Sequence, residues 1–392
     1  MTTHWILEPR DPLVLRDGRP NVGRSAPGLR PFPLPSTIAG ACRTRLGSDA
    51  AGAFAVPRER LDELLHVPVR GPALTDLATG ELYVPPPADA TLFRHEQGGQ
   101  LRGYLLRGVR PHPVPEDARV DYDLGDLELL TMDDPPEGKP DRSLRFWSLS
   151  STLAWLLGEL EPNTEPRPLA ELVRGLGAMP TERRTHVALT ASGTAREGFL
   201  FETEGLRFVG RPPANGTRAE GAGSPLGLYV SMGSFDGKDP APGPAPLGGE
   251  RRLVYWTPSD DRWPSPPEAL LDRAAEGEEA TLRVYLATPA LFEGGWRPGE
   301  RSPLLERRDD LEATLVALSV GPPLSVSGWS LRDRRPKPSR RAAPAGSVLW
   351  IRLRGPGEAR RQWVRDHWLQ CVSCDAQDRL DGWGLCLIGV QR

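Results

Sequence analysis

Arginines near the N-terminus are the residues of this chain whose type and spacing most suggest chemistry. Residues 8–46 contain seven arginines, no lysine and three acidic residues, set among glycines and prolines. The planar guanidinium offers a fork of donors that matches phosphate oxygens, and it also stacks on nucleobases. The pattern indicates a local phosphate site, and a solvated charged surface is the alternative explanation.

Two further basic segments follow later in the chain. Residues 331–346 hold five arginines and one lysine against a single aspartate, and residues 248–252 end in two arginines. The net charge of −3 and the pI near 6.2 exclude a nucleic-acid affinity spread over the whole surface. Single-stranded RNA is bound by local arginines and aromatic side chains, so these runs favour RNA binding.

Glycines bracket an apolar run at the C-terminus, residues 381–389. Because glycine has no Cβ, Gly382, Gly384 and Gly389 let the backbone approach a ligand closely and turn N–H groups toward an anion. An ordinary turn shows the same residues, so this motif is a weak signal by itself.

No segment carries an enzyme signature. The six histidines are scattered, and none belongs to a metal-binding frame. Cys371 and Cys374 have the spacing of half a zinc site, but no second pair completes it. The P-loop, the dinucleotide-binding glycine motif and the nucleophile-elbow serine motif are also missing. We therefore expect no catalytic residues, no metal and no cofactor.

The totals place the chain among globular proteins of more than one domain. With 392 residues it exceeds an ordinary single domain, and its 42 glycines and 43 prolines predict long ordered loops. The N-terminus lacks a signal-peptide pattern, and no apolar run reaches the ~18 residues of a membrane helix. Four cysteines are too few for a disulfide framework. We expect a cytoplasmic protein with no membrane partner.

The first half of the chain predicts strands and helices joined by long loops. Residues 4–15 are typical of an edge strand because they include a proline. Residues 16–35 are typical of a loop, and residues 36–46 of a helix capped by Ser36 or Thr37. Further predictions are strands at 66–74, 80–86 and 103–109, a helix at 150–160 capped by Ser150 or Ser151, and a hairpin at 185–208 that turns at residues 192–194.

The second half repeats this plan. Helices are predicted at 267–277, 309–318 and 358–370, and strands at 280–291, 324–331, 346–353 and 382–390. Two such halves fit an α+β fold of two ferredoxin-like βαββαβ domains with long loop insertions. The predicted domains are residues 1–180 and residues 181–392, with a Gly/Pro-rich insertion around 210–250 in the second.

Three segments together resemble one family. Residues 8–46, 326–350 and 381–389 are similar to the third subunit of the Cmr complex. The members of that family are RAMP-superfamily proteins of type III-B CRISPR effectors. Residues 185–208 and 246–252 also fit that family. The glycine motif is common, but the opening and the block from Ser327 to Ser347 are specific in combination.

The resemblance implies two RRM-like domains whose central surface holds the 5′ repeat-derived tag of the CRISPR RNA. It also implies contacts with the large Cas subunit and the backbone RAMP subunits, an indirect relation to target RNA, and a non-catalytic role in antiviral defence. By position, it carries RNA binding over to Arg10, Arg16, Arg19, Arg24, Ser36, Arg43, Arg251, Arg334, Arg335, Lys337, Arg340, Gly382, Gly384 and Gly389. One departure is Asn21, where relatives have an aromatic residue, so stacking is not expected there.

Two other functions stay open. A metal-independent, RNA-processing endoribonuclease of the same superfamily would use a histidine as general base for a 2′-hydroxyl, with His4 or His186 as candidates. A structural adaptor without RNA contact would use its arginines to bind an acidic protein.

Overall fold

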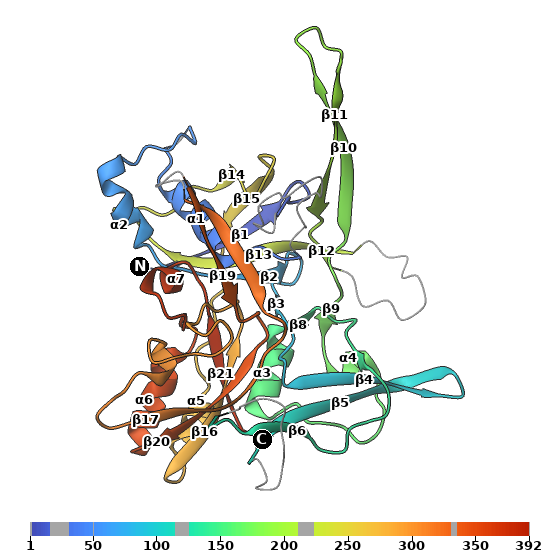
Figure 1. Ribbon diagram of the computed structural model, residues 1–392, viewed down its shortest axis with the longest axis vertical. Coiled ribbons are helices and arrows are strands. Elements are labelled where there is room, and N and C mark those ends of the chain that lie inside the picture. The colour runs from blue at the N-terminus through green and yellow to red at the C-terminus, as the bar shows by residue number, and fades with distance from the viewer. Residues whose placement is uncertain are drawn as a thin grey trace.

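The protein combines many strands with short helices. The computed structural model describes residues 2–15, 31–49, 51–113, 125–210, 223–330 and 335–391. Its fold class is mixed α and β, as the sequence predicts. Figure 1 shows the β10–β11 hairpin (Thr181–Leu189 and Ala195–Leu206) and the β4–β5 hairpin (Ala90–Gln97 and Gln100–His112) projecting from the body.

The larger sheet is built mainly from the N-terminal part of the chain. Its strands are, in spatial order, β14 (Gly243–Pro246), β15 (Leu253–Pro258), β1 (Thr2–Pro9), β13 (Ser224–Gly233), β2 (Val69–Asp76), β3 (Leu82–Val84), β8 (Phe146–Ser148) and β9 (Gly175–Leu176), with β12 (Val209–Gly210) beside β13. Between β1 and β2 lie α1 (Pro35–Leu46), η1 (Arg58–Arg60) and α2 (Leu61–Leu65). β1 pairs on both sides, so its predicted edge position is wrong; Pro9 ends the strand and does not interrupt it.

A long insertion separates β2 from β13. Besides β3, β8, β9 and the β10–β11 hairpin, it contains β6 (Leu129–Met132), β7 (Pro140–Asp141), α3 (Leu149–Leu157) and α4 (Leu169–Leu172). The predicted hairpin and its turn are confirmed. The helix predicted at 150–160 is also confirmed, but its N-cap is Ser148, whose hydroxyl accepts from the backbone N–H of Ser151 at 3.1 Å.

The second sheet is built from the C-terminal part. Its order is β17 (Glu312–Ser319), β20 (Val348–Arg354), β16 (Glu279–Leu286) and β21 (Cys386–Val390). Further elements are α5 (Glu268–Ala275), η2 (Pro303–Leu305), β18 (Leu324–Ser330), β19 (Arg335–Ala342), α6 (Gly357–His367) and α7 (Ala376–Leu380). The helix predicted at 309–318 is wrong. This segment is β17, because its backbone pairs with β20 along most of its length and buries Leu315 to Ala317.

The two sheets share one strand order. Four strands of the first sheet lie side by side in the order β15, β1, β13, β2. Numbered by their order along the chain, these are the fourth, first, third and second strands. The second sheet has the same order, with β21, β16, β20 and β17. All these neighbours are antiparallel. In each half the connection from second to third strand carries a hairpin, β10–β11 or β18–β19. The domain boundary at residue 180 stays a prediction, and β13 and β15, which lie beyond it, pair with β1.

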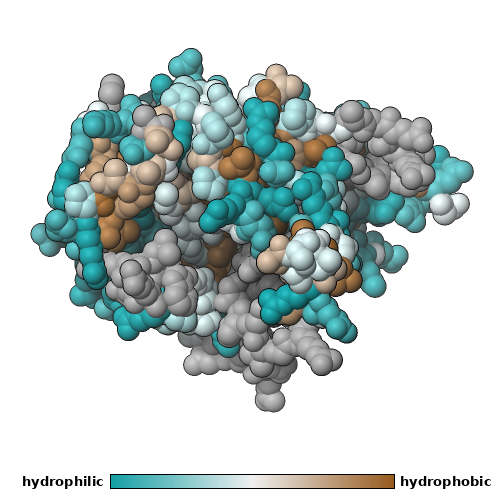
Figure 2. Space-filling view, turned by 90° about the horizontal axis from the view of Figure 1, so that it is seen from above, coloured by the Kyte–Doolittle hydropathy of each residue, from teal (hydrophilic) through white to brown (hydrophobic). Residues whose placement is uncertain are grey.

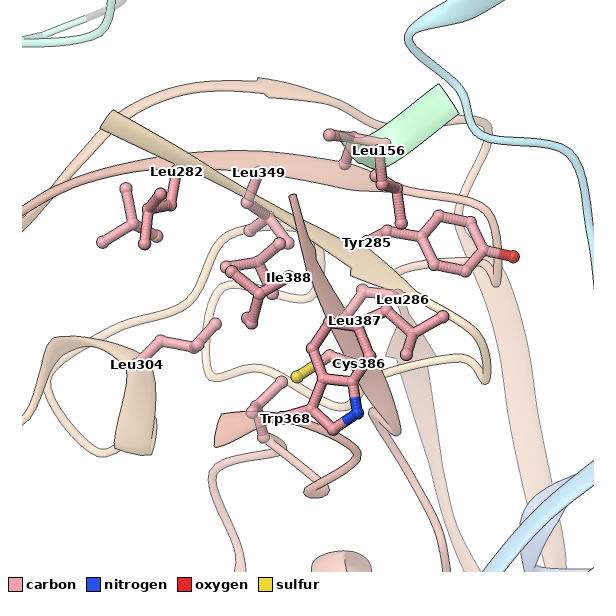
Figure 3. Close-up of a cluster of buried hydrophobic side chains, with 14 of the residues drawn as sticks. Leu156, Leu282, Tyr285, Leu286, Leu304, Leu349, Trp368, Cys386, Leu387 and Ile388 are labelled. Atoms are coloured by element: carbon pink, nitrogen blue, oxygen red, sulfur yellow. The ribbon is translucent and has the colours of Figure 1, made fainter. Parts of the chain in front are cut away.

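A shared core joins the two halves. Leu156 of α3 lies next to Tyr285 of the second sheet, in one cluster with other apolar residues of that sheet (Figure 3). Arg283 of β16 crosses this contact: its guanidinium lies 2.6 Å from the Asp89 carboxylate and donates to the carbonyl oxygens of Trp155 and Leu156. Because this ion pair is almost fully buried and fully hydrogen bonded, it fixes how α3 sits on the second sheet.

Candidate nucleic-acid interface

Leu34, the last residue before α1, is the point where three predicted segments meet. Its side chain packs against a buried cluster of Leu291, Val326, Ala342 and Trp383. Val326 and Ala342 belong to the β18–β19 hairpin, and Trp383 belongs to the terminal glycine segment. The opening, late basic and terminal segments are far apart in sequence, and the fold brings them together here.

Helix α1 begins before the predicted caps. Its N-cap is Leu34, which offers no side-chain acceptor, and Pro35 is the first helical residue. Ser36 and Thr37 therefore lie inside the first turn, and among the described residues their hydroxyl groups have no hydrogen-bond partner. They stand at the positive end of the helix dipole. Thr37 lines a cavity of about 260 Å³ together with Leu34 and residues 248–250.

Arg43 is buried, although the sequence assigned it to RNA. Its guanidinium lies 2.5 Å from a carboxylate oxygen of Asp381 and donates to the carbonyl oxygens of Val67 and Leu380. Both side chains of the pair are less than a tenth exposed, at 6% and 9%. All three guanidinium nitrogens are engaged and the side chain is buried, so Arg43 joins α1 to the C-terminal segment and is not accessible to a phosphate.

The terminal glycines serve close packing. The backbone N–H groups of residues 382–385 all donate to acceptors within the protein, so the amides expected to face an anion are already used. Gly382 has a φ of +90°, and a Cβ there would lie 3.0 Å from two carbonyl oxygens of the β2 region. A Cβ on Gly389 would lie 2.6 Å from the Leu156 carbonyl oxygen. Gly384, with a φ of +81°, is confined in the same way.

The late basic segment forms the β18–β19 hairpin. Cross-strand pairing places Arg335, Lys337 and Arg340 on the face that Val326 shares, while Arg341 pairs with Ser325 on the opposite face. Arg335, Lys337 and Arg341 are exposed, and their side chains have no ion-pair or hydrogen-bond partner among the described residues. These are the free cations of the interface.

Arg340 differs from its neighbours because an acidic pair holds it. Its guanidinium donates to both carboxylate oxygens of Asp378, at 2.7 and 2.8 Å, and lies 3.7 Å from Asp375. The Asp378 hydrogen bonds raise the pKa of Arg340 above its ordinary value. The Asp378 side chain is only 8% exposed, so this contact anchors the base of the hairpin to α7.

The other predicted arginines fall into two groups. Arg10 is half exposed, pairs with Glu8 at 3.0 Å and stacks over the Tyr255 ring at 5.3 Å. Arg251 is exposed on a turn with a φ of +50° and has no partner among the described residues. The remaining predicted contacts lie outside the described residues: Arg16, Arg19, Arg24 and Arg334.

The first sheet offers no open face for base stacking at β1 and β13. Tyr229 is fully buried, and its ring lies edge-on to Trp263 at 5.0 Å between centroids. Its hydroxyl donates to the Asp261 carbonyl oxygen and lies 2.7 Å from His4 Nδ1. Burial raises the pKa of Tyr229. The segment after β15 therefore covers this face.

The β10–β11 hairpin exposes apolar residues that sequence reasoning did not single out. His186 stacks on Phe201 at 5.3 Å, and Arg196 lies 3.9 Å above the Phe199 ring. The opposite face carries a second apolar patch, with Leu189 and Leu200 at 64% and 71% exposure. Figure 2, seen from the side toward which the hairpin points, shows hydrophobic residues among hydrophilic ones. The sequence could have shown this surface, because apolar residues occur at both odd and even positions of the two strands, and these positions point to opposite faces of the hairpin.

The histidine and cysteine candidates lack a catalytic setting. Burial lowers the pKa of His4, and His186 bonds to the Thr203 hydroxyl at 2.8 Å. Cys371 is buried, which raises the pKa of its thiol to about 12. Among the described residues no group of three or more His, Cys, Asp or Glu side chains is placed to hold a metal ion. In the same residues, no helix has the length and apolar character to cross a membrane.

A protein family matches the chain over nearly its whole length. Residues 5–391 match the family described as CRISPR-associated protein (Cas_Cmr3). No curated protein matches the chain. A chain of type III-B Cmr-beta bound to cognate target RNA and AMPPnP is 14% identical, with 88% of this chain and 86% of that chain covered and a TM-score of 0.43. A chain of the Csm3-Csm4 subcomplex of a type III-A CRISPR-Cas interference complex is 9% identical, with 88% and 92% covered and a TM-score of 0.37.

Proposed function

This chain belongs to the CRISPR-associated Cas_Cmr3 family, and from that premise we propose that it is a subunit of a type III-B CRISPR (Cmr) effector complex. Its role there is to hold the 5′ repeat-derived tag of the CRISPR RNA and to dock the large Cas subunit. The observation that carries the RNA role is the β18–β19 hairpin. It presents the exposed side chains of Arg335, Lys337 and Arg341, which have no partner in the described part of the chain, beside the start of α1.

The hairpin binds the sugar–phosphate backbone of the tag through charge. Each phosphate that a free arginine or lysine neutralises releases counterions, so affinity falls as salt rises. Arg340 and Arg43 do not take part, because Asp378 and Asp381 already hold them. Their buried ion pairs instead hold the hairpin and α1 in place. The free cations are therefore already positioned, and less conformational entropy is lost when RNA binds.

The opening loop is the second part of the proposed grip. Arg16, Arg19 and Arg24 lie outside the described residues, and the ends of that loop are Leu15 and Pro31. Leu15 lines the 260 Å³ cavity beside Thr37, and Pro31 lines an apolar cavity of about 150 Å³ next to Leu324 of β18. Both ends therefore adjoin the surface that the hairpin borders.

The β10–β11 hairpin is the described surface best suited to a contact with other subunits. Large exposed apolar side chains on both faces of one projecting hairpin are costly in water and mark an interaction site. Leu189 and Leu200 on one face, and Phe199 and Phe201 on the other, meet that description. Assembly of the effector complex covers them.

We place the chain among non-catalytic subunits. The endoribonuclease alternative needs a histidine base with access to a 2′-hydroxyl and a second group that moves protons. His4 is engaged with the hydroxyl of buried Tyr229, and His186 is bonded to Thr203. Neither setting favours cleavage. In the adaptor alternative the free cations of β19 would bind an acidic protein instead of RNA.

The direct test is a binding measurement with tagged and untagged guide RNA. Purified chain, alone and with the large Cas subunit, is titrated into each RNA at fixed salt. We expect tighter binding of tagged RNA, strengthened by the large subunit, and no cleavage of repeat RNA. Equal binding of both RNAs contradicts tag recognition, and cleavage that disappears in His186→Ala establishes the ribonuclease alternative.

A further inference from the structure

The first sheet leaves apolar side chains uncovered on one face of β14 and β15, the face turned away from α1. Leu253 and Tyr255 of β15 are 42% and 39% exposed, whereas the residues that alternate with them are buried in one cluster with α1. Cross-strand pairing places the exposed Pro246 beside Leu253 and the exposed Pro244 beside Tyr255. We call this face of the sheet the outer face, and these four side chains the β15 strip.

Arg10 borders the β15 strip without giving it a net charge. Its guanidinium lies 5.3 Å from the centroid of the Tyr255 ring and 3.0 Å from the Glu8 carboxylate. Glu8 pairs with Tyr255 across β1 and β15, so these side chains share the outer face. A phosphate site needs cations that are free to neutralise it, and here the cation is already paired. Tyrosine and arginine among uncharged apolar neighbours are instead typical of protein interfaces.

The open edge of β14 is poorly suited to the addition of another strand. The backbone N–H of Leu247 donates to the carbonyl oxygen of Arg252, so alternation turns the backbone of Pro244 and Pro246 toward the open edge. Proline has no N–H, and the edge therefore offers no donor at these two positions. We accordingly expect a partner on the outer face of the strip and not along its edge.

The outer face continues from the β15 strip into the β10–β11 hairpin. Leu13 and Leu206 exchange two backbone hydrogen bonds of 2.9 Å, and both side chains are buried in the cluster behind the sheet. Their neighbours Pro12 and Gly205 meet on the outer face, where a Cβ on Gly205 would lie 2.8 Å from the Pro12 Cβ. Alternation along β11 places Phe201 on the same face, about 13 Å beyond Gly205. Figure 1 shows the hairpin rising from the part of the molecule that holds β14 and β15.

We propose that the β15 strip and the outer face of the β10–β11 hairpin form one docking surface for a single protein subunit with an apolar contact face. The proposal rests on the proposed function, and it adds the strip and Arg10 to the hairpin contact. Four side chains alone fall short of the roughly 800 Å² that each partner buries in a specific interface. Phe201, which is 48% exposed and stacks on His186, extends the apolar area along the same face.

The test uses the full chain with the large Cas subunit and each backbone RAMP subunit, purified separately. Leu253→Ser with Tyr255→Ser should weaken the binding of one of these subunits by about 10- to 100-fold. Phe201→Ser and Arg10→Ala should each weaken the binding of that same subunit. The strip variant and Arg10→Ala should leave the affinity for tagged guide RNA and its salt slope unchanged. Phe54→Ser, which removes an apolar side chain of 48% exposure outside the docking surface, is the matched control.

The possible failures are distinguishable. If the strip variant binds every subunit like the unmodified chain while Leu189→Ser with Leu200→Ser weakens assembly, the strip is wrong and the proposed function stands. If the unmodified chain binds neither a subunit nor tagged RNA, the proposed function fails as well. If the strip variant and Phe201→Ser weaken the binding of different subunits, the single docking surface is wrong.

Two other occupants of the surface would overturn the proposal. Loss of affinity for tagged RNA in the strip variant or in Arg10→Ala would make this face an RNA site. A dimer of the unmodified chain in light scattering that the strip variant abolishes would make it a contact between two copies of this chain. Unchanged unfolding temperatures verify that each variant is folded.

Discussion

Removing Arg43 should destabilise the protein and leave its phosphate contacts unchanged. Arg43→Ala strands the Asp381 carboxylate, which is 9% exposed, and leaves the carbonyl oxygens of Val67 and Leu380 without this donor. Breaking a buried ion pair by removing one partner costs about 3–5 kcal/mol. For a domain of ~200 residues this corresponds to a fall of about 6–20 °C in unfolding temperature.

The assay joins thermal unfolding with RNA binding over a range of salt. Arg43→Ala should unfold at the lower temperature, and at a temperature where it is folded its salt slope should equal that of the unmodified chain. Arg58→Ala, an exposed arginine without a partner among the described residues, is the control for loss of charge alone. Arg43→Ala with Asp381→Ala should cost much less than the sum of the single changes, because the two residues form one contact.

The reasoning is refuted by one combination of results. An unchanged unfolding temperature together with a salt slope reduced by about one would mean that Arg43 reaches a phosphate and that the buried pair does not form in solution.

Three further predictions follow from the same structure. Asp378→Asn should loosen Arg340 and weaken RNA binding while leaving the salt slope unchanged, as measured by titration at several salt concentrations. Burial lowers the pKa of His367, so the folded protein disfavours the charged ring. The contribution of this neutral ring to stability should be complete above about pH 6.5 and should decrease as the pH drops below it. His367→Gln should make the unfolding temperature less dependent on pH in that range. Leu189→Ser with Leu200→Ser should leave the unfolding temperature of the isolated chain unchanged and weaken its assembly with other subunits, as measured by co-purification.

Each of these has a contrary outcome. A steeper salt slope in Asp378→Asn would mean that Arg340, once released from Asp378, becomes a phosphate contact. An unfolding temperature that rises on acidification would contradict the neutral His367. Assembly that survives both serine substitutions would show that the β10–β11 hairpin faces solvent in the complex.

The sequence predicted local elements well where one pattern dominated. The helix at 36–46 and the hairpin at 185–208 were recognised from apolar spacing and turn residues, and both are present. The segment 309–318 misled because its aliphatic spacing suits either a helix or a strand, and pairing with β20 decides the outcome. The edge position expected for β1 failed because the partner strands β13 and β15 lie more than 200 residues away in sequence.

The candidate site shows the same limit. Composition singled out three segments, and the cluster around Leu34 shows that they meet. Composition could not separate Arg43 and Arg340, which hold the fold, from Arg335 and Lys337, which face solvent. That difference depends on whether an aspartate from a distant segment arrives beside the guanidinium.

The central claim is that free cations of the β18–β19 hairpin hold guide RNA by its phosphates. The most direct measurement is the salt dependence of tagged guide RNA binding for Arg335→Ala with Lys337→Ala, beside the unmodified chain. We predict weaker binding and a slope of log affinity against log salt that is smaller by about two. Unchanged affinity with an unchanged slope would contradict the account.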